Sequence, residues 1–253
     1  MLDDPQKLAA FLKMPELRRA IQEDALKRFP EESCGAVTPD GFVPLPNASP
    51  APLISFDCSG ACAELQRDGK LLAVVHSHPN GPEGPSRWDM QFAATMEVPW
   101  GLVALEKDRV GEVFFWGDQL PVPPLEGRGF RHGPSGTDGK GDCYALIRDW
   151  YRVERQIDLP DFPRSDLWWE EKDGPNDLYR DNFAAAGFRQ IEPIAPQPGD
   201  VILCSIRSRV PNHGAVYLGN GLMIHHLHRR LSQIVPVGPW QKMIRMWLRR
   251  EAA

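Results

Sequence analysis

Two histidines lie one residue apart at the end of an apolar run, and an aspartate follows at the end of a Pro/Gly-rich loop. The run is LLAVVH, residues 71–76, and its character predicts a short strand. Residues i and i+2 of a strand project from the same face, so His76 and His78 can point at one ion. Asp89 lies in a segment typical of a helix and could supply an oxygen ligand. Three protein ligands leave a fourth position for water, which is the pattern of a catalytic zinc site.

The same stretch allows an interpretation without a metal. Ser86 and Asp89 have the spacing of a helix N-cap of the capping-box type. Zinc, if bound, would lower the pKa of its water towards ~7, and a base would still be needed to move the proton. Glu32, in PEESCG, is a candidate base that composition alone does not single out. From these residues alone both interpretations stay open.

A second set of reactive side chains lies in the other half of the chain. Cys143 follows a Gly-rich loop at the expected start of a helix, where the positive helix end and free N–H groups favour a thiolate, so we expect its pKa to lie below ~8.5. A thiol nucleophile also needs a base, and His213 opens an apolar hairpin that could pack against this helix. His225, on the returning strand, could hold the imidazole of His213 in position.

Each of these residues also has an ordinary structural explanation. A lone cysteine at a helix start is usually a small buried residue. His226 and His228 compete with His225 for the orienting position. Cys204, within the apolar run VILCSI, is expected to be buried and inert.

The elements that must position these side chains fall into two groups, separated by the Pro-rich segment LPVPPLEG at residues 120–127. Successive prolines hold an extended backbone and cannot continue a helix. We therefore predict an α+β chain of two domains, residues 1–120 and 127–253, joined by a linker over 121–126. The predicted helices are 16–28, 87–96 and 143–154; the predicted strands are 71–76, 100–105, 111–116 and the run DVILCSI; and the hairpin is HGAVYLGNGLMIHH, turning at Gly219-Asn220-Gly221.

Bulk properties fit a folded protein of ordinary composition. The chain has 253 residues, 42% hydrophobic and 25% charged, with a formal net charge of −5. That charge does not indicate nucleic-acid recognition, and no apolar stretch approaches the roughly 20 residues of a transmembrane segment. The first residues lack the pattern of a signal peptide. The five irregularly spaced cysteines favour reduced thiols in a cytoplasmic setting.

The motifs of the first half resemble a known signature. ESCG at residues 32–35, HSHP at 76–79 and SxxD at 86–89 resemble, in order and spacing, the JAMM (MPN-plus) metalloprotease family over roughly residues 15–118. The resemblance implies a mixed α/β fold and cleavage of peptide or isopeptide bonds. It implies that one Zn²⁺ is held by His76, His78 and Asp89. It also implies that Glu32 is the general base and that Ser86 helps to stabilise the oxyanion.

The second half resembles the NlpC-type cysteine peptidases, which have a papain-like fold. The resemblance is carried by DCYxLxR, HGAVYLGNG and MIH over roughly residues 127–245. It implies that Cys143 is the nucleophile, His213 the base and His225 the polar third residue, acting on peptides of the bacterial cell wall. This chain has Phe130 where that family commonly has a tyrosine that serves the oxyanion site. Without that hydroxyl, the oxyanion would have to be stabilised by the backbone N–H of Cys143 and one other donor. Arg131 and His132 are the candidates for this second donor.

A JAMM-like domain followed directly by an NlpC-like domain resembles the tail assembly protein K family of long-tailed phages and related gene-transfer particles. The resemblance implies a protein of the virion tail tip, made and assembled in the host cytoplasm. Its implied partners are tail hub and central tail fibre proteins and peptidoglycan stem peptides. The leading hypothesis is a peptidoglycan endopeptidase that acts during cell-wall penetration. The alternatives are a structural assembly or plug protein with weak or lost activity, and a deubiquitinase-like isopeptidase, which leaves the second domain unexplained.

Overall fold

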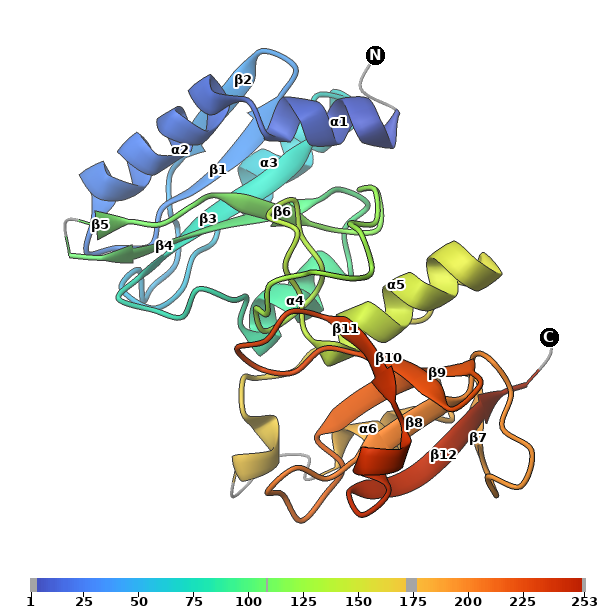
Figure 1. Ribbon diagram of the computed structural model, residues 1–253. Helices are drawn as coiled ribbons and strands as arrows, with labels where there is room; N and C mark the ends of the chain where they lie inside the picture. Colours follow the sequence, from blue (N-terminus) through green and yellow to red (C-terminus); the bar gives the residue numbers. More distant parts are fainter. Residues whose placement is uncertain (1–3, 108, 172–176, 252–253) are drawn as a thin grey trace. The chain divides into compact units, whose positions relative to one another are not determined.

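The computed structural model describes residues 4–107, 109–171 and 177–251. The chain divides into two compact units (Figure 1). The first comprises residues 1–121 and a short return segment, Gly136–Asp138; the second comprises residues 122–135 and 139–253. The return segment pairs with the end of the first unit, since Thr137 N donates to the Phe115 carbonyl at 2.8 Å. No local pattern predicts this return, because it depends on pairing between residues far apart in the chain.

The first unit is a mixed sheet with helices on both faces. Its strands lie in the order β2-β1-β3-β4-β5, with β6 also pairing β4, and only β3 and β4 are parallel. The strands are β1 (Cys34–Thr38), β2 (Gly41–Leu45), β3 (Ala73–Pro79), β4 (Trp100–Glu106), β5 (Arg109–Val110) and β6 (Phe114–Trp116). The helices are α1 (Pro5–Leu12), α2 (Pro15–Arg28), α3 (Ser59–Arg67) and α4 (Arg87–Ala93).

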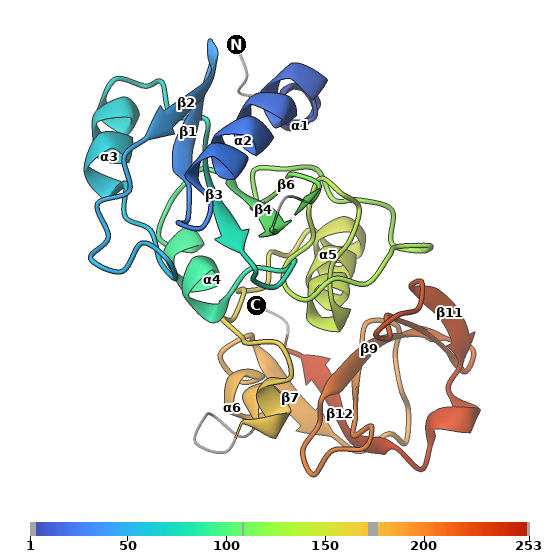
Figure 2. The ribbon, with the colours of Figure 1, turned by 90° about the vertical axis from the view of Figure 1, so that its left-hand side faces the viewer.

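Successive side chains of β3 point to opposite faces of the sheet and pack in two separate apolar clusters. Ala73 and Val75 pack in the cluster that contains α1 and α2, whereas Val74 packs in the cluster with α3. Figure 2 shows α2 and α3 on opposite sides of these strands. Because strand residues alternate in direction, His76 and His78 share the side of Val74, and the strand presents them together.

The second unit packs helix α5 (Cys143–Arg155) on a six-stranded sheet of order β11-β10-β9-β8-β12-β7. The strands are β7 (Phe188–Ile191), β8 (Val201–Cys204), β9 (His213–Gly219), β10 (Leu222–His225), β11 (Gln233–Pro236) and β12 (Ile244–Arg250). The described part of the unit also contains the 3-10 turns Trp168–Glu170 and Gly238–Trp240 and helix α6 (Leu178–Asn182). Val201, Leu203 and Val216 face α5, while Ile202, Cys204 and Ala215 form the cluster on the other face.

The predicted hairpin is present, and the backbone conformation of its turn explains why Asn220 and Gly221 occupy it. Asn220 and Gly221 have φ of 52° and 73°, the left-handed pair that a type I′ turn requires. The bounds of three predicted elements are wrong. Strand β3 runs over Ala73–Pro79 rather than 71–76. Helix α4 ends at Ala93 rather than 96, and Thr95 Oγ1 donates to the Phe92 carbonyl just beyond this end. The strand predicted over 111–116 begins only at Phe114. Within the described residues no helix is long and apolar enough to cross a membrane.

Candidate functional site

The first unit brings His76, His78 and Asp89 together below the end of β3. Their candidate ligand atoms all lie within 4.8 Å of one another, and all three residues are buried. Nε2 of His76 lies 3.2 Å from Oδ1 of Asp89, and Nε2 of His78 lies 3.2 Å from Oδ2. Two imidazole nitrogens and one carboxylate oxygen are a donor set that suits Zn²⁺.

The capping box is also present, and it positions the same carboxylate. Ser86 Oγ accepts from the Asp89 N–H at 3.1 Å, and the Ser86 N–H donates to Asp89 Oδ2 at 2.6 Å. The two interpretations of SxxD are therefore compatible. The start of α4 fixes the carboxylate that faces the histidines, and the Ser86 hydroxyl keeps its own proton for donation.

Outer contacts fix the two rings. His78 Nδ1 lies 3.1 Å from the Pro82 carbonyl, which leaves Nε2 towards Asp89. His76 stacks on Phe56 with ring centroids 4.4 Å apart. Burial would favour the protonated form of Asp89, but the two histidines overcome this effect and lower the pKa of its carboxyl.

Glu32 lies two residues before the start of β1 and is also buried, at 8% exposure. Burial raises its pKa to about 7, while the charge of His78 partly opposes the shift. A carboxyl with this pKa exchanges protons near neutrality, as a general base must. The structure thus places Glu32 in the electrostatic field of His78 and Asp89, although the two segments are far apart in the sequence.

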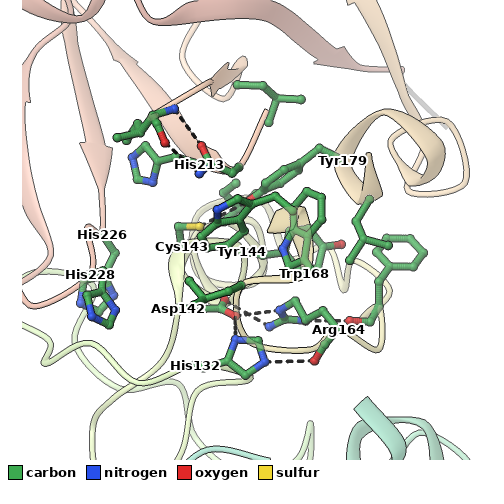
Figure 3. Close-up of a pocket in the computed structure, with 18 of the residues that line it drawn as sticks. His132, Asp142, Cys143, Tyr144, Arg164, Trp168, Tyr179, His213, His226 and His228 are labelled. Carbon is green, nitrogen blue, oxygen red and sulfur yellow. Dashed lines mark hydrogen bonds and ion pairs between the residues drawn. The ribbon is translucent and has the colours of Figure 1, made fainter. Parts of the chain in front are cut away.

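The second unit brings Cys143 and His213 to one pocket of about 660 Å³ (Figure 3). Cys143 is the first residue of α5, and His213 is the first residue of β9. His213 Nε2 lies 3.2 Å from Nδ1 of His225, which β10 carries alongside. Among the three histidines that compete for the orienting position, the contact belongs to His225; the rings of His226 and His228 pack edge-on against Phe130.

The electrostatics of the thiol differ from the sequence-based expectation. Burial raises the pKa of Cys143, and the neighbouring charge of Asp142 raises it further, against the lowering effects of Tyr179 and the Gly214 amide. Burial also lowers the pKa of His213 to about 3 and that of His225 to about 4. The expectation of a pKa below the free value was wrong, because it considered the helix end but not the burial or the N-cap carboxylate. These shifts favour a protonated thiol and a neutral imidazole in the resting pocket.

Asp142 ties the start of α5 to a buried arginine that the sequence did not reveal. Its Oδ1 accepts from the Ala145 N–H at 2.8 Å as the helix N-cap. Arg164 donates to both carboxylate oxygens, at 2.7 and 3.1 Å, and also pairs with Asp161 at 2.7 Å. The arrangement fixes the residue next to the nucleophile.

Of the two donors proposed to replace the tyrosine hydroxyl, His132 lines the pocket, and both residues already contact backbone carbonyls. Arg131 donates to the carbonyls of His132 and Pro134, and Nε2 of His132 lies 3.0 Å from the Arg164 carbonyl. The hydroxyl that contacts the thiol belongs to Tyr179 in α6, with Oη 3.2 Å from Sγ. Cys204 is fully buried in β8, as predicted, and burial raises the pKa of its thiol to about 12.

Comparison with known proteins finds one family in each unit. Residues 14–117 match the prokaryotic homologs of the JAB domain, and residues 127–249 match the NlpC/P60 family. The chain is 41% identical to the tail tip assembly protein K of Escherichia phage lambda over 68% of this chain and 76% of that protein. It is 30% identical to the protein of the same name from Escherichia phage N15, over 88% of this chain and 89% of that one. A probable TtuB-protein conjugate cleaving protease of Thermus thermophilus is 41% identical over 23% of this chain and 43% of its own length.

Proposed function

The chain belongs to the tail tip assembly protein K family, and from that premise we propose that its second unit is a cysteine endopeptidase of cell-wall peptides. The observation that carries the proposal is the pocket that Cys143 and His213 both line, with His225 in contact with the imidazole of His213. A thiol, a neutral base and a residue that orients the base are the parts of a nucleophilic hydrolase. The NlpC/P60 match over residues 127–249 supports the same chemistry.

The proposed reaction follows from the neutral resting state. His213 takes the thiol proton as Sγ of Cys143 attacks the scissile carbonyl, and His225 keeps the accepting nitrogen directed at the pocket. The imidazolium then gives the proton to the leaving amine as the C–N bond breaks. Water, deprotonated by His213, hydrolyses the acyl-enzyme and restores the thiol.

The site of action is proposed from the relatives, which are named as tail tip proteins. We place this chain in the virion tail tip, beside tail hub and central tail fibre proteins, after assembly in the host cytoplasm. Cleavage of peptidoglycan stem peptides there would open the wall locally during penetration.

Digestion of purified peptidoglycan tests the function. The wild-type chain should release soluble peptide fragments with new amino ends, seen by mass spectrometry, and Cys143→Ala should release none above background because the nucleophile is absent. His78→Ala is the matched control, since it changes the first unit and leaves the thiol pocket intact. Equal fragment release by the wild type and Cys143→Ala would contradict the proposal, and so would an inactive wild type, which would favour the structural assembly or plug role.

For the first unit we propose one Zn²⁺ held by His76, His78 and Asp89, whose donor set and burial fit that ion. Zinc in such a site polarises a carbonyl and lowers the pKa of bound water. Glu32 would hold or move a proton beside it, and Ser86 would donate a hydrogen bond to the developing oxyanion.

Metal analysis of the purified chain should find about one zinc per molecule. His78→Ala should remove it, because only two ligands would remain. His228→Ala, a histidine of the second unit, should keep the full amount. If the wild type stays free of metal after zinc is supplied and excess is removed, the ligand assignment is wrong.

A further inference from the structure

Tyr179 is the side chain in hydrogen-bond contact with the proposed nucleophile. Its Oη lies 3.2 Å from Sγ of Cys143, and it reaches the thiol from α6, which lies in the chain between the motif of the cysteine and the motifs of the histidines. Figure 3 shows its ring extending across the pocket towards Cys143. The motif position before the nucleophile holds Phe130, which has no hydroxyl.

The approach of Tyr179 depends on close packing around the thiol. A Cβ at Gly214 would lie 3.0 Å from the Tyr179 hydroxyl and 2.6 Å from Cδ1 of Ile147, so a larger residue there would require the end of the Ile147 side chain to shift. The ring itself is held edge-on against Tyr144 and Trp168, with centroids 6.2 and 6.1 Å apart. The hydroxyl is therefore fixed beside the thiol rather than free in solvent.

The hydroxyl is also in the right state to donate. Burial, together with the neighbouring thiol, raises the pKa of Tyr179 well above its usual value, so the group stays protonated near neutrality. The first-turn N–H of Cys143 has no intrahelical partner and can supply a second hydrogen bond at the same place. Two converging donors are the usual composition of an oxyanion site.

We propose that Tyr179 is a catalytic residue that donates the hydrogen bond to the oxyanion which the Phe130 position cannot supply. The inference rests on the proposed cysteine peptidase activity. As the Sγ–C bond forms, the thiol proton passes to His213 and the carbonyl π electrons move to the oxygen. That oxygen sits on the carbon bonded to Sγ, one atom away, so a donor 3.2 Å from Sγ can turn onto it without moving the ring. The carbonyl double bond forms again when the C–N bond breaks and His213 protonates the leaving amine.

Tyr179→Phe keeps the ring and removes the hydroxyl. In the full chain, kcat for wall-peptide cleavage should fall about 100-fold while KM changes little, because the lost bond forms in the transition state. Tyr217→Phe is the matched control: its hydroxyl accepts from the Gly221 N–H at 3.1 Å in the β9–β10 turn, away from the pocket, and its kcat should stay within about twofold.

A second measurement separates oxyanion binding from a general effect on the thiol. Alkylation of Cys143 by iodoacetamide has no oxyanion, so its rate at pH values high enough to ionise the thiol should be the same in Tyr179→Phe and the wild type, within about twofold. Equal losses in alkylation and cleavage would overturn the inference and make Tyr179 a residue that positions the thiol. Unchanged cleavage in Tyr179→Phe would overturn it as well.

An activated ester keeps this test separate from the wall substrate. Hydrolysis of p-nitrophenyl acetate forms a tetrahedral intermediate on Cys143 with no wall-specific contact, and Cys143→Ala sets its background. If the wild type cleaves the ester but not peptidoglycan, the proposed substrate is wrong, and a large loss of ester hydrolysis in Tyr179→Phe still supports the inference. A wild type that cleaves neither substrate overturns the peptidase assignment and the role of Tyr179 together.

Discussion

Replacing His213 with alanine is expected to lower the rate of wall-peptide hydrolysis by about 10⁴-fold or more. The physical reason is the resting state of the site. Burial and Asp142 raise the pKa of the Cys143 thiol, so little thiolate exists at neutral pH, and the reaction needs a base that takes the proton during attack. Steady-state rates on purified peptidoglycan, with the alkylation rate of Cys143 measured in parallel, test this expectation.

Two further histidine variants make the expectation specific. His225→Ala should cost about 100-fold, because the imidazole of His213 loses the partner 3.2 Å away but the base itself remains. His228→Ala should change the rate by less than about threefold, since its ring packs against Phe130. Losses of the same size in all three variants would point to unfolding of the pocket rather than to a base and its orienting partner.

Local patterns were sufficient to predict the elements on which these residues lie. The apolar run before His76, the cysteine after a Gly-rich loop and the turn at Gly219–Gly221 each predicted the type of element found. They did so because strand alternation, helix starts and tight turns depend on neighbouring residues. The predicted end of α4 was wrong because the Thr95 hydroxyl competes there for the backbone carbonyl of Phe92.

The geometry around the thiol could not be predicted in the same way. Tyr179 and Arg164 lie in irregular or short segments with no periodicity, and their partners are 36 and 22 residues distant in the chain. The direction of the pKa shift at Cys143 was missed for a related reason. A helix start is visible in the sequence, whereas the burial that outweighs it is a property of the packed unit.

The second large effect concerns stability. Arg164→Met is expected to destabilise the second unit by about 3–5 kcal/mol, because it leaves the buried Asp142 carboxylate without its charged partner. The pair lies at the first turn of α5, so the loss should appear there before the rest of the unit. Hydrogen exchange of the α5 amides in the full chain, followed by mass spectrometry, measures the free energy of local opening of this helix and so the loss caused by the substitution.

Two comparison variants show whether the cost comes from the unpaired charge. Arg180→Met removes an exposed partner of Asp177, 3.4 Å away, and should cost less than about 1 kcal/mol. Arg164→Met combined with Asp142→Asn should recover a large part of the loss, because asparagine still accepts from the Ala145 N–H as N-cap but carries no charge to bury. If the double variant were less stable than Arg164→Met by the full cost of a second substitution, the two residues would act independently. The ion pair would then not be what holds the nucleophile's turn in place.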